Sequence, residues 1–160
     1  MAGSRRGRGR PRVREAHAGR YASHETAPLT GVILDSDIII EVLRGRADVI
    51  ESVYALEASA TPTYCTPISV AEVYAGIRPH EGQVTRDFFE ARGEVVLDAD
   101  TGRRAGVYLA RYARSHGVEI ADALVAAAAT TSDLWLWTLN RKHYPMDDIQ
   151  FFEPAKPLTL

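Results

Sequence analysis

Short apolar runs alternate with stretches of helical periodicity along most of this 160-residue chain, and this alternation constrains its fold more than any other feature. The apolar runs predict strands at residues 32–34, 63–66, 94–97, 134–139 and 149–152. Apolar residues spaced three or four apart predict helices at residues 38–43, 48–59, 69–77, 83–92, 101–115 and 121–131. Strands that alternate with helices form βαβ units, which build a parallel sheet with helices on both faces. We therefore predict a three-layer α/β fold with a central parallel β-sheet of four to five strands.

Residues 134–139 (LWLWTL) form an almost continuous apolar run. A strand with no polar face is covered on both sides, as happens in the middle of a parallel sheet, so we predict that this strand is central. The helix predicted at residues 101–115 has an apolar face that includes Ala105, Tyr108 and Tyr112. This face should lie in the core or in a dimer interface.

The composition divides the chain into a tail, a domain and a short end segment. Residues 1–30 are rich in Arg, Gly, Ser and Ala and have no apolar periodicity, which predicts a disordered N-terminal tail. Residues 31–153 are predicted to form one domain, and residues 154–160 a C-terminal tail. Residues 1–20 hold seven arginines and one acid, which leaves a net charge of −8 on residues 21–160. Because phosphate contacts depend on Lys and Arg, this acidic part must bind nucleic acid locally or through a metal ion.

Two motifs in the arginine-rich tail could indicate DNA binding or export, and simpler interpretations exist for both. Residues 8–11 (RGRP) resemble the core of an AT-hook, which places a basic strand in the minor groove of DNA. The simpler interpretation is a solvated arm, or residues that precede the true translation start. Arg5 and Arg6 are followed by more arginine and glycine instead of the apolar segment of about 7 to 15 residues that an export signal needs. We therefore expect no export.

The cysteine content and the apolar runs indicate a cytoplasmic protein. Cys65 is the only cysteine, so neither a disulfide nor a cysteine-based zinc site is expected, and a reducing compartment suits the chain. The longest apolar runs, such as residues 123–129, fall far short of the roughly 20 residues that span a bilayer. We expect no membrane partner.

Polar side chains occur where the predicted sheet should have its carboxyl edge. Asp35 ends the first strand, Glu72 lies in the first turn of the helix after the second strand, and Asn140 follows residues 134–139. Asp122 opens the preceding helix. Ligands of open parallel sheets bind at the carboxyl ends of the strands, so these residues should converge. Converging carboxylates repel each other unless a cation compensates them, and Mg²⁺, or Mn²⁺ in its place, prefers such oxygen ligands.

Structural alternatives exist for three of these residues. Residues 69–72 (SVAE) fit a capping box, in which Glu72 would bind the N-cap backbone. Asp122 could interact with a helix dipole, and Asn140 could occupy a turn. Asp35 is harder to explain structurally, because an acid directly after three apolar strand residues suits an edge site better than the strand.

Four segments resemble, in order, the motifs of the PIN-domain family, specifically the VapC-type toxins of bacterial toxin-antitoxin pairs. They are residues 34–39 (LDSDII), 68–76 (ISVAEVYAG), 120–126 (IADALVA) and 138–144 (TLNRKHY). The resemblance extends over roughly residues 31–152, which is nearly the whole predicted domain. It implies a PIN-like fold and a Mg²⁺-dependent endoribonuclease that cleaves RNA phosphodiester bonds. It also implies a homodimer and a cognate VapB-like antitoxin that neutralises the toxin.

The resemblance assigns roles to individual residues. Asp35, Glu72 and Asp122 would bind the metal, and Asn140 would occupy a fourth position that is Asp in many relatives and Asn in others. Asp37 stands where many relatives have Asn, so it would either join the metal shell or fix the loop.

Basic side chains close to these motifs are candidates for binding RNA phosphates. They are Arg44, Arg46, Arg141 and Lys142. The alternative is that they are solvated surface charges. His116 and His143 lack a recognisable nucleophile arrangement, so we interpret them as structural residues and assign neither a general-base role.

Two other functions compete with this interpretation. A haloacid-dehalogenase-like phosphatase would use Asp35 and Asp37 as nucleophile and acid, but residue Ile39 is usually Thr or Val in that family, and Glu72 and Asp122 would have no role. A non-catalytic PIN fold that binds nucleic acid or protein is the second alternative. The intact acids at all three main positions argue against it.

Overall fold

The computed structural model of the protein describes residues 31–155 and Leu158, and the predictions for residues 1–30 lie outside the described residues. The described elements are, in chain order, β1 (Val32–Leu34), α1 (Ser36–Leu43), α2 (Ala47–Ala58), β2 (Thr63–Cys65), α3 (Pro67–Ala75), α4 (Gly82–Glu90), β3 (Gly93–Glu94), α5 (Ala99–His116), α6 (Ile120–Thr131), β4 (Trp135–Trp137) and the 3₁₀ helix η1 (Arg141–His143). No helix in this part of the chain is long and apolar enough to cross a membrane.

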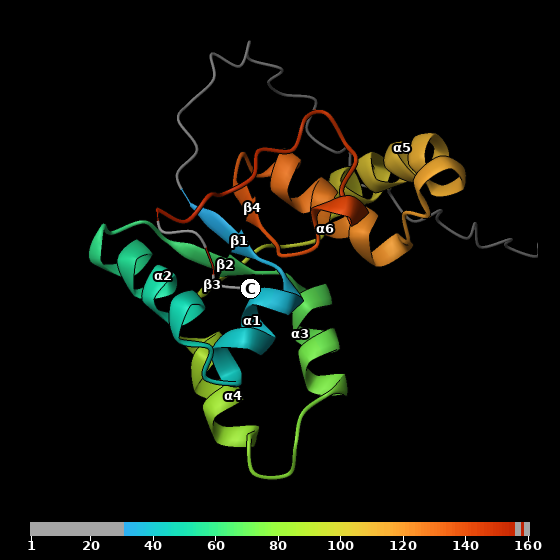
Figure 1. Ribbon diagram of the computed structural model, residues 1–160. Helices are drawn as coiled ribbons and strands as arrows, with labels where there is room; N and C mark the ends of the chain where they lie inside the picture. Colours follow the sequence, from blue (N-terminus) through green and yellow to red (C-terminus); the bar gives the residue numbers. More distant parts are fainter. Residues whose placement is uncertain (1–30, 156–157, 159–160) are drawn as a thin grey trace, which may run out of the picture.

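The sheet is parallel and has the strand order β3-β2-β1-β4 (Figure 1). The predicted central position of the strand at residues 134–139 is therefore wrong, because β1 and β2 lie in the middle and β4 is the last of the four strands. Its outer edge is covered by an extended segment, where Leu136 donates to the carbonyl of Gln150 and accepts from the N–H of Phe152, both at 2.9 Å. β4 is apolar although it is not central, because Leu136 packs with α5 and α6 on one face of the sheet and Trp137 packs with α1 to α4 on the other. The strand predicted at residues 149–152 is reduced to this single bridge at Phe151.

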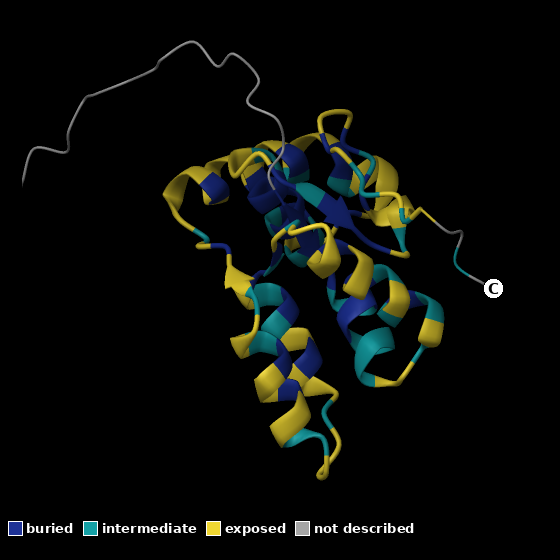
Figure 2. Cartoon of the chain, turned by 90° about the vertical axis from the view of Figure 1, so that its left-hand side faces the viewer, coloured by how far each residue is buried: buried dark blue, intermediate teal, exposed yellow. Residues whose placement is uncertain are grey.

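Helices cover both faces of the sheet, which confirms the three-layer α/β architecture (Figure 1). Val32 and Leu34 pack with α1 to α4, whereas Ile33 between them packs with α5 and α6. All three side chains of β1 are 0% exposed, because successive residues of a strand point to opposite faces and both faces are covered. Figure 2 shows the same arrangement, with buried strands and inner helix surfaces and exposed outer helix surfaces.

Helices α5 and α6 pack tightly on one face of the sheet. The predicted apolar face of α5 is buried through Ala105, Tyr108 and Tyr112. Residues 126–129 of α6 are all alanines and are buried, so the two helices approach each other closely. Gly117 ends α5 with a φ of +67°, a left-handed conformation that glycine adopts without strain.

Helix α3 begins earlier than the sequence pattern predicts. Its N-cap is Thr66, whose hydroxyl accepts the backbone N–H of Ser69 at 3.1 Å, and Pro67 occupies the first helical position. The alternative capping box over residues 69–72 is therefore wrong, because a different residue caps the helix. Glu72 lies within α3 and takes no part in the cap.

Two glycines allow the strands to approach the ring of Tyr64. A Cβ added to Gly31 would lie 2.6 Å from Cε2 of Tyr64 and 2.8 Å from the carbonyl oxygen of Pro62. A Cβ at Gly93 would lie 2.5 Å from Cδ1 of the same ring. Glycine is required at these positions because a side chain would overlap its neighbours.

Candidate active site

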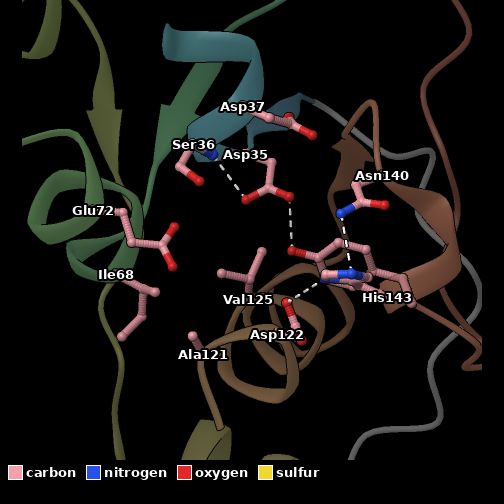
Figure 3. A pocket seen from close by; sticks show the side chains of 11 residues that line it. Asp35, Ser36, Asp37, Ile68, Glu72, Ala121, Asp122, Val125, Asn140 and His143 are labelled. Atoms are coloured by element: carbon pink, nitrogen blue, oxygen red, sulfur yellow. Dashed lines mark hydrogen bonds and ion pairs between the residues drawn. The ribbon is translucent and has the colours of Figure 1, made fainter. Parts of the chain in front are cut away.

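A pocket of about 150 Å³ opens at the carboxyl edge of the sheet and collects the four principal residues predicted from the sequence (Figure 3). They are Asp35, Glu72, Asp122 and Asn140. Asp35 follows β1, Glu72 lies on the helix after β2, Asp122 lies in the first turn of α6, and Asn140 follows β4. The pocket is also lined by Ser36, Asp37, Ile68, Ala121, Val125, His143 and Tyr144. The topology therefore brings together side chains that are far apart in the sequence.

Asp35 is buried, and each of its two carboxylate oxygens accepts a hydrogen bond. It is the N-cap of α1, and its Oδ1 accepts the backbone N–H of Ser36 at 2.8 Å. Its Oδ2 accepts the hydroxyl of Tyr144 at 2.8 Å. Burial raises the pKa of Asp35, the two hydrogen bonds act in the opposite direction, and the charge of Asp122 adds a smaller increase. The carboxylate is thus fixed in orientation and costly to ionise without a compensating cation.

Asp37 contacts the segment that follows β4. Its Oδ2 accepts the hydroxyl of Thr138 at 3.2 Å and the backbone N–H of Leu139 at 3.0 Å. Its Oδ1 is buried and has no hydrogen-bond partner within the described residues. Burial, followed by repulsion from Asp35, raises the pKa of Asp37 to about 6. Asp37 therefore ties α1 to the loop, a role that differs from the free acid required by the phosphatase alternative.

Glu72 points into the pocket from α3 (Figure 3). Its side chain is exposed, and no hydrogen bond or ion pair engages it in the part of the chain that the structure describes. The carboxylate is therefore available to a ligand in the pocket.

Asp122 combines a structural contact with a place in the pocket. Its Oδ2 accepts the backbone N–H of Glu119 at 3.1 Å, within a reciprocal capping box at the start of α6. Its Oδ1 lies 3.5 Å from Nδ1 of His143. The amide nitrogen of Asn140 lies 3.1 Å from Nε2 of the same imidazole. A tautomer protonated at Nδ1 would satisfy both contacts, since Asn140 donates to the unprotonated Nε2.

Three functional side chains were missed or undervalued by sequence reasoning. His143 links Asp122 to Asn140 in the pocket and is more than a loop residue. Tyr144 contacts Asp35 across 109 positions, so no local pattern could indicate this bond. Thr138 donates to Asp37 and also accepts the N–H of Asn140 at 3.0 Å.

The basic residues after the first motif do not line this pocket. Arg44 lies 3.7 Å from Glu41 on the same helix. Arg46 forms an ion pair of 2.9 Å with Asp48 and a longer one with Glu41. Both guanidinium groups face acids from nearby residues of the chain.

The basic residues after β4 lie beside the pocket without lining it. Arg141 forms an ion pair of 2.5 Å with Glu153, and its guanidinium lies over the ring of Phe151 at 4.8 Å. Lys142 is exposed and has no side-chain partner within residues 31–155 or at Leu158. It directly precedes His143, which lines the pocket.

The donor set of the pocket suits a hard divalent cation. Asp35, Glu72 and Asp122 provide carboxylate oxygens, and Asp37 adds a buried Oδ1 without a partner in the described residues. Within that part of the chain, no three or more His, Cys, Asp or Glu side chains are gathered closely enough to form a metal site. Mg²⁺ is usually bound through one or two carboxylates, with water and substrate as further ligands. One or two of these carboxylates, completed by water and substrate, are therefore enough for the residues present to fit such an ion by their chemistry.

Known proteins have sequences similar to that of this chain. Residues 32–149 match the PIN domain. Ribonuclease VapC10 of Mycobacterium tuberculosis is 34% identical over 128 residues, which are 79% of this chain and 91% of that protein. Ribonuclease VapC19 of the same species is 30% identical over 115 residues, which are 71% of this chain and 92% of that protein.

A solved structure has a fold similar to that of this chain. The crystal structure of DNA-bound VapBC from Salmonella typhimurium superposes with a TM-score of 0.67 at 17% identity, over 78% of this chain and 98% of that chain. The family match spans most of the predicted domain, and VapC10 and VapC19 are matched over nearly their whole length. The chain belongs to the PIN-domain family.

Proposed function

We propose that this protein is a divalent-metal-dependent endoribonuclease that acts as the toxin of a toxin-antitoxin pair. The observation that carries the proposal is the convergence of Asp35, Glu72 and Asp122 from three separate elements on one pocket. Relatives that match most of the chain are named ribonucleases, which supports RNA as the substrate. The acidic pocket would repel an RNA phosphate, so a cation has to accompany the substrate.

Asp35, Glu72 and Asp122 would hold the ion, which we propose to be Mg²⁺, with Mn²⁺ as a substitute. When bound, it would activate a water for attack on the phosphodiester and neutralise charge on the phosphate. The protein contributes fixed side chains: Ser36 and Tyr144 orient Asp35, and the N–H of Glu119 orients Asp122. Carboxylates held in place in this way need no reorganisation when the substrate reacts.

Asn140 would be the fourth catalytic residue of the pocket, and the neighbouring basic residues would contact RNA. Asn140 is held by its backbone N–H, which donates to Thr138 at 3.0 Å, and its amide faces His143. We propose that Arg141 and Lys142 bind flanking phosphates, since they adjoin the pocket. Arg44 and Arg46 are weaker candidates, because nearby acids engage them.

We also propose a VapB-like antitoxin as partner and a homodimer as the free state. The fold resembles that of chains from solved VapBC complexes, which supports an antitoxin partner. Val107 on α5 and Ile120 on α6 are apolar and exposed, so each is a candidate for the dimer interface. Contact between the N-terminal tail and DNA concerns residues outside the described part of the chain.

The test follows cleavage of total bacterial RNA by protein purified free of antitoxin, with Mg²⁺ or with EDTA. Asp35→Ala and Asp122→Asn should abolish cleavage, while Asp100→Asn should leave it unchanged. Asp100 is an exposed acid on α5 whose side chain pairs with Arg103 outside the pocket. Thermal melting would verify that each variant is folded.

The outcomes separate the candidate functions. Cleavage only by metal-loaded wild type and Asp100→Asn supports the proposal. Equal cleavage by Asp35→Ala and Asp122→Asn would place the activity elsewhere or in a contaminant. Folded wild type that cleaves no RNA would favour the non-catalytic PIN fold.

A further inference from the structure

Tyr144 forms a hydrogen bond with Asp35 inside the pocket. The tyrosine hydroxyl donates to Oδ2 of Asp35 at 2.8 Å, and the bond is buried. Tyr144 is only 5% exposed, and its side chain lines the pocket together with the carboxylate that it contacts. The bond therefore joins the loop after η1 to the end of β1 at the point where the acids converge.

The two oxygens of Asp35 are anchored by different elements. Oδ1 accepts the N–H of Ser36, which belongs to the same helix start, and Oδ2 accepts Tyr144 from the opposite end of the chain. An ionised carboxylate has about four lone-pair sites, so each oxygen keeps capacity for another ligand. The two contacts thus fix the plane of the carboxylate and leave lone pairs on both oxygens for a metal ion.

The tyrosine itself is held in place by the backbone. The N–H of Tyr144 donates to the carbonyl of Arg141 at 2.9 Å, which closes the turn of η1. Within the described residues, Asp35 is the only hydrogen-bond partner of the hydroxyl. Rotation of Asp35 would leave a buried hydroxyl without a partner, which is unfavourable. The bond therefore resists rotation of the acid.

We propose that Tyr144 is a positioning residue that presents Asp35 to the metal ion. This inference rests on the proposed function, because it assumes that Asp35 is a metal ligand. Groups that hydrogen-bond to metal ligands fix the ligand geometry, and their removal typically weakens metal affinity by about 10- to 100-fold. The proposal assigns Tyr144 a role through Asp35 and none in the attack on the phosphate.

The test measures Mn²⁺ binding to purified protein by electron paramagnetic resonance of the free ion. Tyr144→Phe removes one oxygen and should raise the dissociation constant for Mn²⁺ by about 10-fold. Tyr108→Phe is the matched control, because it removes the hydroxyl of another buried tyrosine, which bonds to Thr130 and Asp148 at 3.0 and 2.9 Å outside the pocket. Its dissociation constant for Mn²⁺ should equal that of the wild type. If loss of stability alone weakened binding, Tyr108→Phe would weaken it as well.

A double variant tests whether Tyr144 acts through Asp35. Asp35→Asn should weaken Mn²⁺ binding, and adding Tyr144→Phe to it should cause no further loss. RNA cleavage gives a second readout: Tyr144→Phe should need about 10-fold more Mg²⁺ for half-maximal rate and regain most of the wild-type rate at saturation.

Three results would overturn the inference. The first is unchanged or tighter Mn²⁺ binding by Tyr144→Phe, the latter meaning that the hydroxyl competes with the ion. The second is a full additional loss in the Asp35→Asn background. The third is the absence of Mn²⁺ binding by folded wild-type protein, which would also refute the proposed metal site. The first two leave the proposed function intact, so the two failures are distinguishable.

Discussion

The backbone N–H of Leu139 donates to Oδ2 of Asp37 at 3.0 Å, although 102 positions separate the two residues. The hydroxyl of Thr138 donates to the same oxygen at 3.2 Å. One carboxylate therefore joins the first turn of α1 to the segment after β4, which carries Asn140 and His143 into the pocket. The position of the last site residues depends on this link.

The raised pKa of Asp37, about 6 instead of 3.8, predicts a defined pH dependence. Between these two values the folded protein retains a proton that the unfolded chain has lost. The free energy of unfolding of the metal-free protein should therefore fall as the pH rises through this window. Asp37→Asn lacks this titration, so relative to the variant the wild type should lose up to about 3 kcal/mol between about pH 4 and about pH 7.

Urea denaturation of both proteins with a chelator present would measure this difference. The asparagine keeps an oxygen that can accept from Leu139 and Thr138, so the link itself is preserved. Parallel stability curves for wild type and variant across this pH range would show that Asp37 does not titrate in the folded state as expected.

Replacement by alanine should affect RNA cleavage at Glu72 and stability at Thr66. Glu72 has no hydrogen-bond partner in the described part of the chain, so Glu72→Ala should change the free energy of unfolding by less than about 0.5 kcal/mol. It should lower RNA cleavage by about 100-fold, equivalent to about 3 kcal/mol of transition-state stabilisation. Thr66→Ala removes the cap of α3 and should destabilise the protein by about 1 kcal/mol.

Chemical denaturation and single-turnover cleavage would measure both effects. A destabilisation by Glu72→Ala as large as that by Thr66→Ala would restore the capping-box interpretation of residues 69–72. Normal cleavage by folded Glu72→Ala would remove this residue from the metal site.

Lys142 is the predicted phosphate contact without an acidic partner among the described residues. Lys142→Ala should therefore lower kcat/KM for RNA and reduce the slope of log kcat/KM against log salt by about 0.7, as expected for one lost phosphate contact on a single strand. Arg46→Ala is the comparison, because Asp48 engages this guanidinium at 2.9 Å. Equal salt slopes for wild type and Lys142→Ala would mean that Lys142 remains in solvent when RNA binds.

Gly31 and Gly106 should respond in opposite directions to alanine. At Gly31 the new Cβ would lie 2.8 Å from the backbone oxygen of Pro62, so Gly31→Ala should destabilise the fold by about 1–3 kcal/mol. Gly106 lies within α5 with open space around its Cβ position, so Gly106→Ala should stabilise by about 0.5–1 kcal/mol. Thermal melting of the two variants would check this. A stable Gly31→Ala variant would show that the ring of Tyr64 and the backbone near Pro62 can shift.

Local patterns in the sequence determined the elements and the side of the sheet that carries the site. The alternation of apolar runs and helical periods depends on residues within a few positions of one another, so strands β1, β2 and β4 and all six α-helices could be predicted. The strand after α4 is shorter than predicted, with only Gly93–Glu94 in the ladder. Because strands of one direction place their carboxyl ends together, the convergence of Asp35, Glu72, Asp122 and Asn140 also followed from their positions in the chain.

Only the tertiary structure decided how those residues are held. The bond between Tyr144 and Asp35 and the link from Asp37 to Leu139 each span more than a hundred positions, so they depend on strand order and loop path. The position of β4 beside β1 was likewise set by pairing between distant segments, whereas the Thr66 cap followed by Pro67 is a local signal that the sequence already carried. The spacing of apolar residues in the sequence indicates which face of a helix or strand is apolar. Which distant side chain meets a given carboxylate is fixed only when the layers pack together.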